Sequence, residues 1–220
     1  MKVVLFVIFL CFTTSTNSFL HCEQDELNFH WSLMKLGKNG TKTPINLDLN
    51  KEVTPLNKSD IIWLYFNPIS NLFLYVFLDD SDNELNMLFL EQTTFYNNGY
   101  LKNTQFYLPN NYGWTFTGNS GEEKFIVLVS KSRLFKLEKL VDDLNRIRVS
   151  KSNSKSKHEK SSLIQSEIIK EITLLRRANS SYIVEPEKQT PMAGAEKSIG
   201  TLINEVKAST FYARTIKIKH

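Results

Sequence analysis

Hydrophobic residues recur at two spacings along the chain, first at every second residue and later at every third or fourth. Phe29, Trp31 and Leu33 alternate with polar residues, as in a strand that buries one face. Further apolar stretches follow, and turn residues such as Asn39-Gly40 separate them. We predict strands at 27–36, 61–66, 71–78, 85–90, 105–108, 114–116 and 124–130. Short strands at this spacing are typical of an antiparallel sandwich or a curled sheet.

The helical spacing begins after residue 130. Ser132 is a candidate N-cap, and an apolar stripe runs from Leu134 to Ile147. Ser162 and Gln165 have the spacing of a capping box, which predicts the start of a second helix. The sequence therefore predicts two helices packed on the sheet by one face each.

The second half of the chain also contains a polar stretch, and it ends in a segment where polar and apolar residues alternate. The Ser/Lys-rich segment 148–160 predicts a flexible basic spacer, and apolar residues in 199–206 predict a short third helix. Residues 211–218 alternate as a strand does, and this strand has to find backbone partners in the first sheet. We expect one α+β domain over 27–220, with a sandwich-like or curled antiparallel core, two to three helices and a C-terminal strand that returns to the sheet.

The first residues predict export. Lys2 precedes an uncharged apolar run over 3–12, and small polar residues follow over 13–18. This order is that of a secretory signal peptide, and the apolar run is shorter than the ~20 residues that span a bilayer. We predict a signal peptide at 1–18, a mature N-terminal tail at 19–26, and a periplasmic, envelope-bound or secreted protein.

The two cysteines add one open question. Cys11 lies within the signal peptide, so Cys22 has no partner for an intramolecular disulfide after cleavage. Cys22 is a candidate lipid-attachment site, although Phe19-Leu20-His21 is a poor lipobox. The alternatives are a soluble protein and an intermolecular disulfide. We expect membrane association only if Cys22 is lipidated.

Charge and motifs narrow the possible chemistry. The formal net charge of +4 is a mild excess, and it does not favour a nucleic-acid partner. The chain has no phosphate-binding glycine loop and no closely spaced Cys/His set for zinc, so we expect no cofactor and no metal site. Asp80, Asp82 and Glu84 alternate as calcium ligands can, but the Gly and the distant bidentate Glu of a calcium loop are missing, so we favour a solvated hairpin turn.

Two classes of function remain. An extracytoplasmic hydrolase would have to bring groups such as Glu122, Glu123 and His30 into one cleft. A non-enzymatic binding module needs only a surface, and 79–84, 109–114 and the basic stretch 146–160 are candidates. We favour 109–114, where Tyr112 and Trp114 lie at a turn and could contact a ligand or partner.

Several stretches resemble a known family. They are Lys58-Ser59-Asp60-Ile61, Leu74-Tyr75-Val76-Phe77, the acidic hairpin 80–85, Leu108-Pro109, Gly121-Glu122-Glu123, Val127-Leu128-Val129-Ser130 and the ending from Phe211. Together they are similar to the bacterial domain of unknown function 4384, over roughly 28–220. Ser59 stands where family members commonly have Gly. The resemblance implies an exported stand-alone member with no catalytic residues, acting as a binding or accessory module for an envelope protein or glycan.

Overall fold

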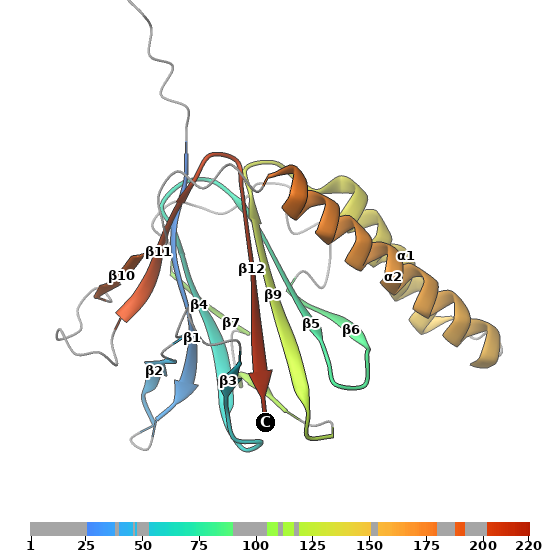
Figure 1. The fold of residues 1–220 in the computed structure, drawn as a ribbon, viewed down its shortest axis with the longest axis horizontal. Helices are drawn as coiled ribbons and strands as arrows, with labels where there is room; N and C mark the ends of the chain where they lie inside the picture. The colour runs from blue at the N-terminus through green and yellow to red at the C-terminus, as the bar shows by residue number, and fades with distance from the viewer. Residues whose placement is uncertain are drawn as a thin grey trace, which may run out of the picture.

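Two packed β-sheets and a pair of helices form the computed structural model (Figure 1). It describes residues 26–37, 40–45, 47, 53–89, 105–109, 112–116, 119–150, 154–179, 188–191 and 202–220. The predicted signal peptide, the tail 19–25 and Cys22 lie outside the described residues. Within the described residues, no helix is long and apolar enough to cross a membrane.

The first sheet, sheet A, has β1 and β4 at its centre. Its strand order is β10 (Lys188–Pro191), β11 (Leu202–Ala208), β1 (Leu27–Leu36), β4 (Ile61–Pro68) and β7 (Phe106–Leu108). Two short strands join it, β2 (Lys42–Pro44) on β1 and β8 (Trp114–Thr115) on β4. All pairings in this sheet are antiparallel, so each strand presents alternate residues to its two faces.

The second sheet, sheet B, contains the closing strand in its interior. Its order is β3 (Thr54–Pro55), β12 (Phe211–Lys219), β9 (Glu122–Ser130), β5 (Phe73–Asp79) and β6 (Leu85–Phe89). β12 pairs with β9 along its whole length and runs parallel to β3. The predicted return of 211–218 to the sheet is therefore confirmed.

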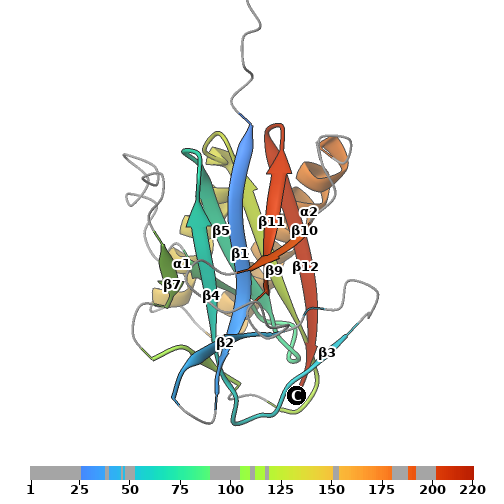
Figure 2. The ribbon, with the colours of Figure 1, turned by 90° about the vertical axis from the view of Figure 1, so that its left-hand side faces the viewer.

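In Figure 2 sheet A faces the viewer, with β1 between β4 and β11, and sheet B lies behind it. The main core fills the space between the two sheets and continues between sheet B and the helices. Phe29 and Trp31 of β1 point toward sheet B, where the ring of Tyr212 meets them with centroids 5.3 and 6.3 Å apart. All three side chains are almost completely buried. The period-two pattern of β1 thus predicted the correct inward face.

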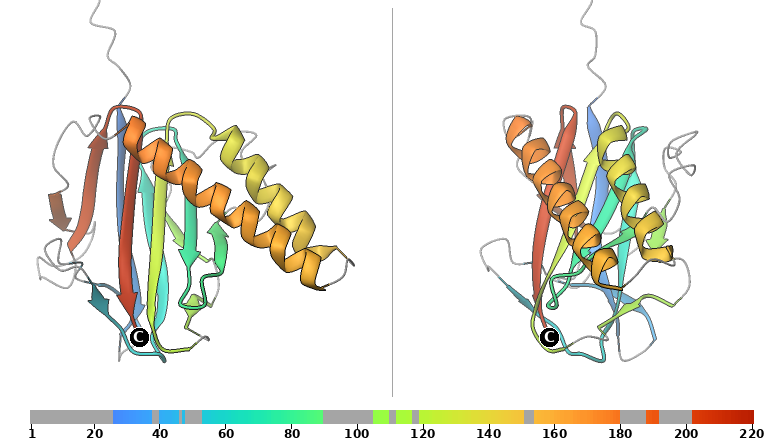
Figure 3. Two further views of the ribbon diagram at one scale, coloured as in Figure 1. Left: turned by 45° about the vertical axis from the view of Figure 1, so that its right-hand side comes forward. Right: turned by 90° about the vertical axis from the view of Figure 1, so that its right-hand side faces the viewer.

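Two antiparallel helices cover the outer face of sheet B. α1 (Phe135–Val149) and α2 (Ser154–Ala178) lie across it, and their connected ends project beyond β6 (Figure 3). The predicted α+β sandwich-like fold is confirmed, with two helices in the described part of the chain.

The predicted third helix at 199–206 is wrong, because the described part of this segment forms β11. β11 pairs antiparallel with β1, with Leu27 opposite Ala208. Val206 packs in the main core, whereas Ile203 packs on the opposite face of sheet A with Met34 and Trp63. Because both faces of the strand bury apolar residues, the alternation is hidden and the spacing imitates a helix.

The structure also shortens the predicted spacer. Helix α1 continues to Val149 and α2 starts at Ser154, so only the residues between them are a connection. Ser162 and Gln165 lie inside α2 rather than at its start, and the N-cap of α1 is Leu134 rather than Ser132. Lys, Ser and Glu are tolerated in a helix whose other turns are held by packing.

Candidate functional site

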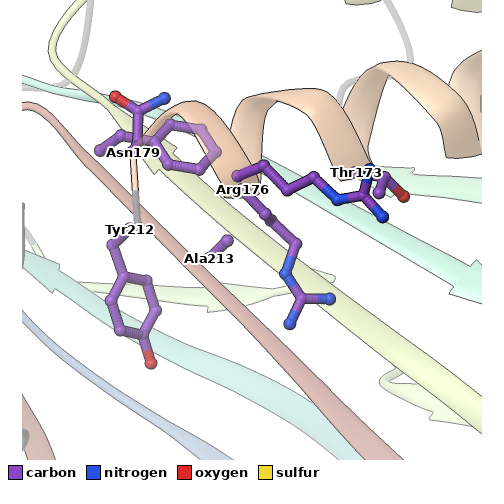
Figure 4. A pocket seen from close by; sticks show the side chains of 7 residues that line it. Thr173, Arg176, Asn179, Tyr212 and Ala213 are labelled. Carbon is purple, nitrogen blue, oxygen red and sulfur yellow. The ribbon is translucent and has the colours of Figure 1, made fainter. Parts of the chain in front are cut away.

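An open cavity of about 510 Å³ lies where the end of α2 passes over β12. Figure 4 shows Thr173, Arg176 and Asn179 entering it from α2, while Tyr212 and Ala213 belong to β12. The described lining consists of Thr173, Arg176, Arg177, Asn179, Phe211, Tyr212 and Ala213. A cavity of this volume is within the usual range for small-ligand sites, about 300–1,000 Å³.

Two guanidinium groups give this cavity its charge. Arg176 and Arg177 occupy the last turn of α2, where the helix dipole favours cations. Nη1 of Arg176 donates to Oγ1 of Thr215 at 3.1 Å, which holds that guanidinium over the sheet. None of the described lining residues carries a carboxylate. The cavity is therefore electropositive, and its chemistry suits an anion.

The other lining residues fix the shape of the cavity. Nδ2 of Asn179 donates to the carbonyl oxygen of Leu175 at 2.7 Å, which closes the last turn of α2. Phe211 is buried in the floor, and the ring of Tyr212 is anchored on the opposite sheet by Phe29. The two arginines are thus presented from a rigid frame, which limits the conformational entropy lost when a ligand binds.

The predicted contact residues Tyr112 and Trp114 lie elsewhere, beside β4 of sheet A. Tyr112 is 88% exposed. Trp114 is partly buried against the main core, and its ring lies 5.5 Å from that of Phe125. Gly113 between them has φ +73°, and a Cβ there would come within 2.5 Å of a methyl group of Ile61. The turn therefore packs closely against β4. Tyr112 faces the solvent, whereas Trp114 packs against the core.

This separation gives a testable difference in stability. We expect Trp114→Ala to lower the free energy of unfolding by about 2 kcal/mol, roughly half the cost of deleting a fully buried aromatic side chain. Tyr112→Ala should change it by less than about 0.5 kcal/mol. Urea denaturation of both variants checks this, and equal stabilities would show that Trp114 makes no net packing contribution.

Glu122, Glu123 and His30, which the hydrolase hypothesis would place in one cleft, lie on different faces of the two sheets. Glu123 points into the space between the sheets, whereas its neighbour Glu122 points to the other face of β9 and pairs with Lys217 at 3.7 Å. His30 lies on the outer face of sheet A opposite Glu205. Burial lowers the pKa of His30, and the nearby Glu205 carboxylate partly opposes this. These three side chains share no cleft.

The acidic turn 79–84 is organised by its own backbone. Oδ1 of Asp80 accepts hydrogen bonds from the backbone N–H groups of Asp82 and Glu84, at 3.1 and 2.8 Å. Glu84 in turn pairs with Arg148 at 3.1 Å. Among the described residues, no set of three His, Cys, Asp or Glu side chains is arranged to hold a metal ion. The alternating carboxylates therefore have a structural explanation as a hairpin turn.

The basic stretch 146–160 is divided between the two helices. Arg148 is not part of a free surface, because it also donates to the carbonyl oxygen of Leu85 at 2.9 Å and ties α1 to β6.

The arginines of the α2–β12 cavity were not among the predicted site residues. The adjacent Arg176-Arg177 pair, at the end of an apolar stripe and just before Asn179, is the signal that could have identified them.

The fold and the cavity define the protein as an α+β sandwich with a basic site at one end of its helical layer. Comparison with models of known families, with curated proteins and with solved structures found no match. The resemblance to the bacterial domain of unknown function 4384 stays a prediction.

Proposed function

We propose that this protein is an exported, non-enzymatic binding or accessory module of the bacterial cell envelope. In this proposal it captures an anionic group of an envelope protein or glycan in the α2–β12 cavity. The observation that carries the proposal is the pair of guanidinium groups, Arg176 and Arg177, on a cavity of about 510 Å³ without a carboxylate in its described lining. The export part rests on the apolar run 3–12 and the small residues after it.

The chemistry of the cavity supports capture rather than turnover. Guanidinium groups bind carboxylates and phosphates through paired, charge-assisted hydrogen bonds. The hydroxyl group of Thr173 donates to the backbone carbonyl oxygen of Ile169 at 2.8 Å, so the guanidinium groups are the donors available to an anion here.

We expect the double variant Arg176→Gln/Arg177→Gln to lose envelope binding. The loss should be at least tenfold in affinity, equivalent to about 1.4 kcal/mol, because both charges at the cavity are removed. The measurement is co-sedimentation of the full chain with a purified envelope fraction, at low and high salt. Arg146→Gln is the matched control, since this arginine lies on α1 with a side chain that is 73% exposed and forms an ion pair with Asp143.

The control separates the cavity from general charge. If Arg146→Gln weakens binding as much as the double variant does, the partner recognises overall positive charge and the cavity is not the site. Unchanged binding of a folded double variant would also refute the proposal. Circular dichroism establishes that the double variant is folded, so that a lost site can be distinguished from a lost fold.

A further inference from the structure

The exposed apolar side chains of the protein are concentrated on its helical layer. Among the described residues, seven large apolar side chains are exposed, and five of them belong to α1 and α2. The five are Phe135, Val149, Leu163, Ile169 and Leu174. Single exposed apolar residues are normal on any protein surface, so it is their concentration on one layer that indicates an interaction surface.

Helix α2 presents part of this set along one outward line. Leu163, Lys170 and Leu174 are spaced by seven and four residues, which places them on one side of the helix. Ile168 and Ile172 lie on the opposite side and are buried in the main core. The right-hand view of Figure 3 shows both helices in front of sheet B, so the line of Leu163 faces away from the sheet.

Phe135 adds an aromatic ring at the start of α1. This residue is 68% exposed, and the guanidinium group of Arg133 lies 4.9 Å from the centroid of its ring, in a cation–π contact. An ion pair between Lys136 and Glu171 joins the start of α1 to the C-terminal part of α2. Phe135 therefore lies at the same end of the layer as Leu174.

The positive charge of the chain is concentrated on the same layer. Helix α2 contains six lysines and arginines against three glutamates, and α1 contains four cationic against three acidic residues. The two helices together carry a formal charge of +4, which equals the formal net charge of the whole chain. The charges of the rest of the sequence are thus balanced, and the helical layer is the part that attracts an anionic surface.

The order of apolar and charged residues favours a membrane over a folded protein as the partner. A protein interface has an apolar centre from which charged residues are depleted. On the outward line of α2, in contrast, Lys170 lies between Leu163 and Leu174. A layer of lipid headgroups accepts this order, because apolar side chains reach the acyl boundary while lysines stay beside the lipid phosphates. Anionic lipids also attract the net charge of the layer.

We propose that the outer face of α1 and α2 docks on an anionic membrane surface, with the helices in the plane of the membrane. Phe135, Leu163 and Leu174 insert among the lipid headgroups, and Lys170 lies beside their phosphates. This docking needs no lipid on Cys22, so it differs from the expectation that membrane association depends on lipidation. It uses none of the described residues that line the α2–β12 cavity, and it is independent of the ligand of that cavity.

Vesicle binding of the mature chain tests the proposal. The protein begins at Phe19 and carries Cys22→Ser, so neither the apolar run 3–12 nor an acyl chain can anchor it. Every described strand and helix is retained, because the first begins at Leu27. Co-sedimentation compares vesicles of equal parts phosphatidylcholine and phosphatidylglycerol with vesicles of phosphatidylcholine alone. We expect at least tenfold tighter binding to the anionic vesicles, and weaker binding as the salt concentration rises.

Two double variants connect the binding to the outer face. Leu163→Ser/Leu174→Ser should weaken binding to anionic vesicles at least tenfold, because two inserted side chains become polar. Lys160→Gln/Lys170→Gln should reduce the preference for anionic over neutral vesicles. All four residues are exposed, so both variants should fold, and circular dichroism checks this. Tyr112→Ser is the matched control, because this 88% exposed aromatic residue lies beside sheet A, and it should bind like the unmodified protein.

Other results would overturn the proposal. Absence of vesicle binding, equal binding to neutral and anionic vesicles, or equal binding by all variants would each do so. Loss of binding in Arg176→Gln/Arg177→Gln, with unchanged binding by Leu163→Ser/Leu174→Ser, would show that the lipid phosphate enters the α2–β12 cavity instead. A dimer in analytical ultracentrifugation that Leu163→Ser/Leu174→Ser converts to a monomer, without vesicle binding, would make the outer face an interface between copies of this chain.

Discussion

Deleting residues 211–220 should leave a chain that does not fold. β12 lies inside sheet B, where its nine residues pair with β9 on one side and its last two pair with β3 on the other. The deletion removes four buried side chains, those of Phe211, Tyr212, Ile216 and Ile218. At about 1.5–3 kcal/mol each, their burial amounts to about 6–12 kcal/mol, which is comparable with the whole stability of a typical domain, about 5–15 kcal/mol.

Far-ultraviolet circular dichroism and urea denaturation measure this effect. A point variant provides a graded test: Ile216→Ala should cost about 2–5 kcal/mol, as buried aliphatic truncations do. Lys217→Ala on the same strand is its control, because its pair with Glu122 is exposed on both sides and is worth at most about 1 kcal/mol. A truncated chain that still unfolds cooperatively would show that sheet B is stable without β12.

The second large effect is expected at the junction of α1 with sheet B. Glu138 is buried, and its Oε1 accepts a hydrogen bond of 2.7 Å from the hydroxyl group of Tyr75. Arg133 donates to both carboxylate oxygens from the same side, with its Nε at 3.2 Å from each. The Tyr75 hydroxyl group also accepts a hydrogen bond from the backbone N–H of Leu134, at 2.9 Å. The Glu138 carboxylate therefore joins the start of α1 to β5.

We expect Glu138→Ala to lower the free energy of unfolding by about 3–5 kcal/mol, the usual range when one partner of a buried ion pair is removed. Burial raises the pKa of Tyr75, so its hydroxyl group stays protonated and keeps its donor at every pH of interest. Lys139→Ala is the matched control on the same helix, because its pair with Asp143 is exposed and contributes less than about 1 kcal/mol. Equal urea midpoints for the two variants would contradict this account.

The sequence predicted the strands best where one face is polar. In β1 the alternation of Phe29, Trp31 and Leu33 identifies the buried face directly, and β12 shows a similar alternation. The pattern misled in β11, where Ile203 and Val206 are buried on opposite faces of sheet A. Local periodicity reports how many faces of a segment are buried, and it cannot distinguish a strand buried on both faces from an amphipathic helix.

The candidate sites were harder to predict because they depend on contacts between distant segments. Arg176 meets Thr215 only after α2 has packed across sheet B. Glu123 stands between Glu122 and Lys124 at the start of β9, and nothing local shows that its side chain is buried and that one of its oxygens lacks a donor. An aromatic residue at a turn, such as Trp114, is a natural candidate for a binding residue in a sequence. Whether its side chain faces solvent depends on the strand against which the turn packs, here β4.

The pairing of β1 with β11 and the insertion of β12 into sheet B have a consequence for how the chain folds. The hairpin of β5 with β6 and the helix pair α1–α2 use neighbours in sequence, so they can form early. β1 has to pair with β11, which brings Leu27 opposite Ala208, and β9 has to pair with β12 before the central strands of either sheet are fully paired. Folding dominated by such non-local pairing is slow, because the loop-closure entropy is lost before the contacts form. We therefore expect refolding on the millisecond-to-second scale typical of all-β topologies, during which the apolar strands of both sheets stay open to aggregation or to a chaperone.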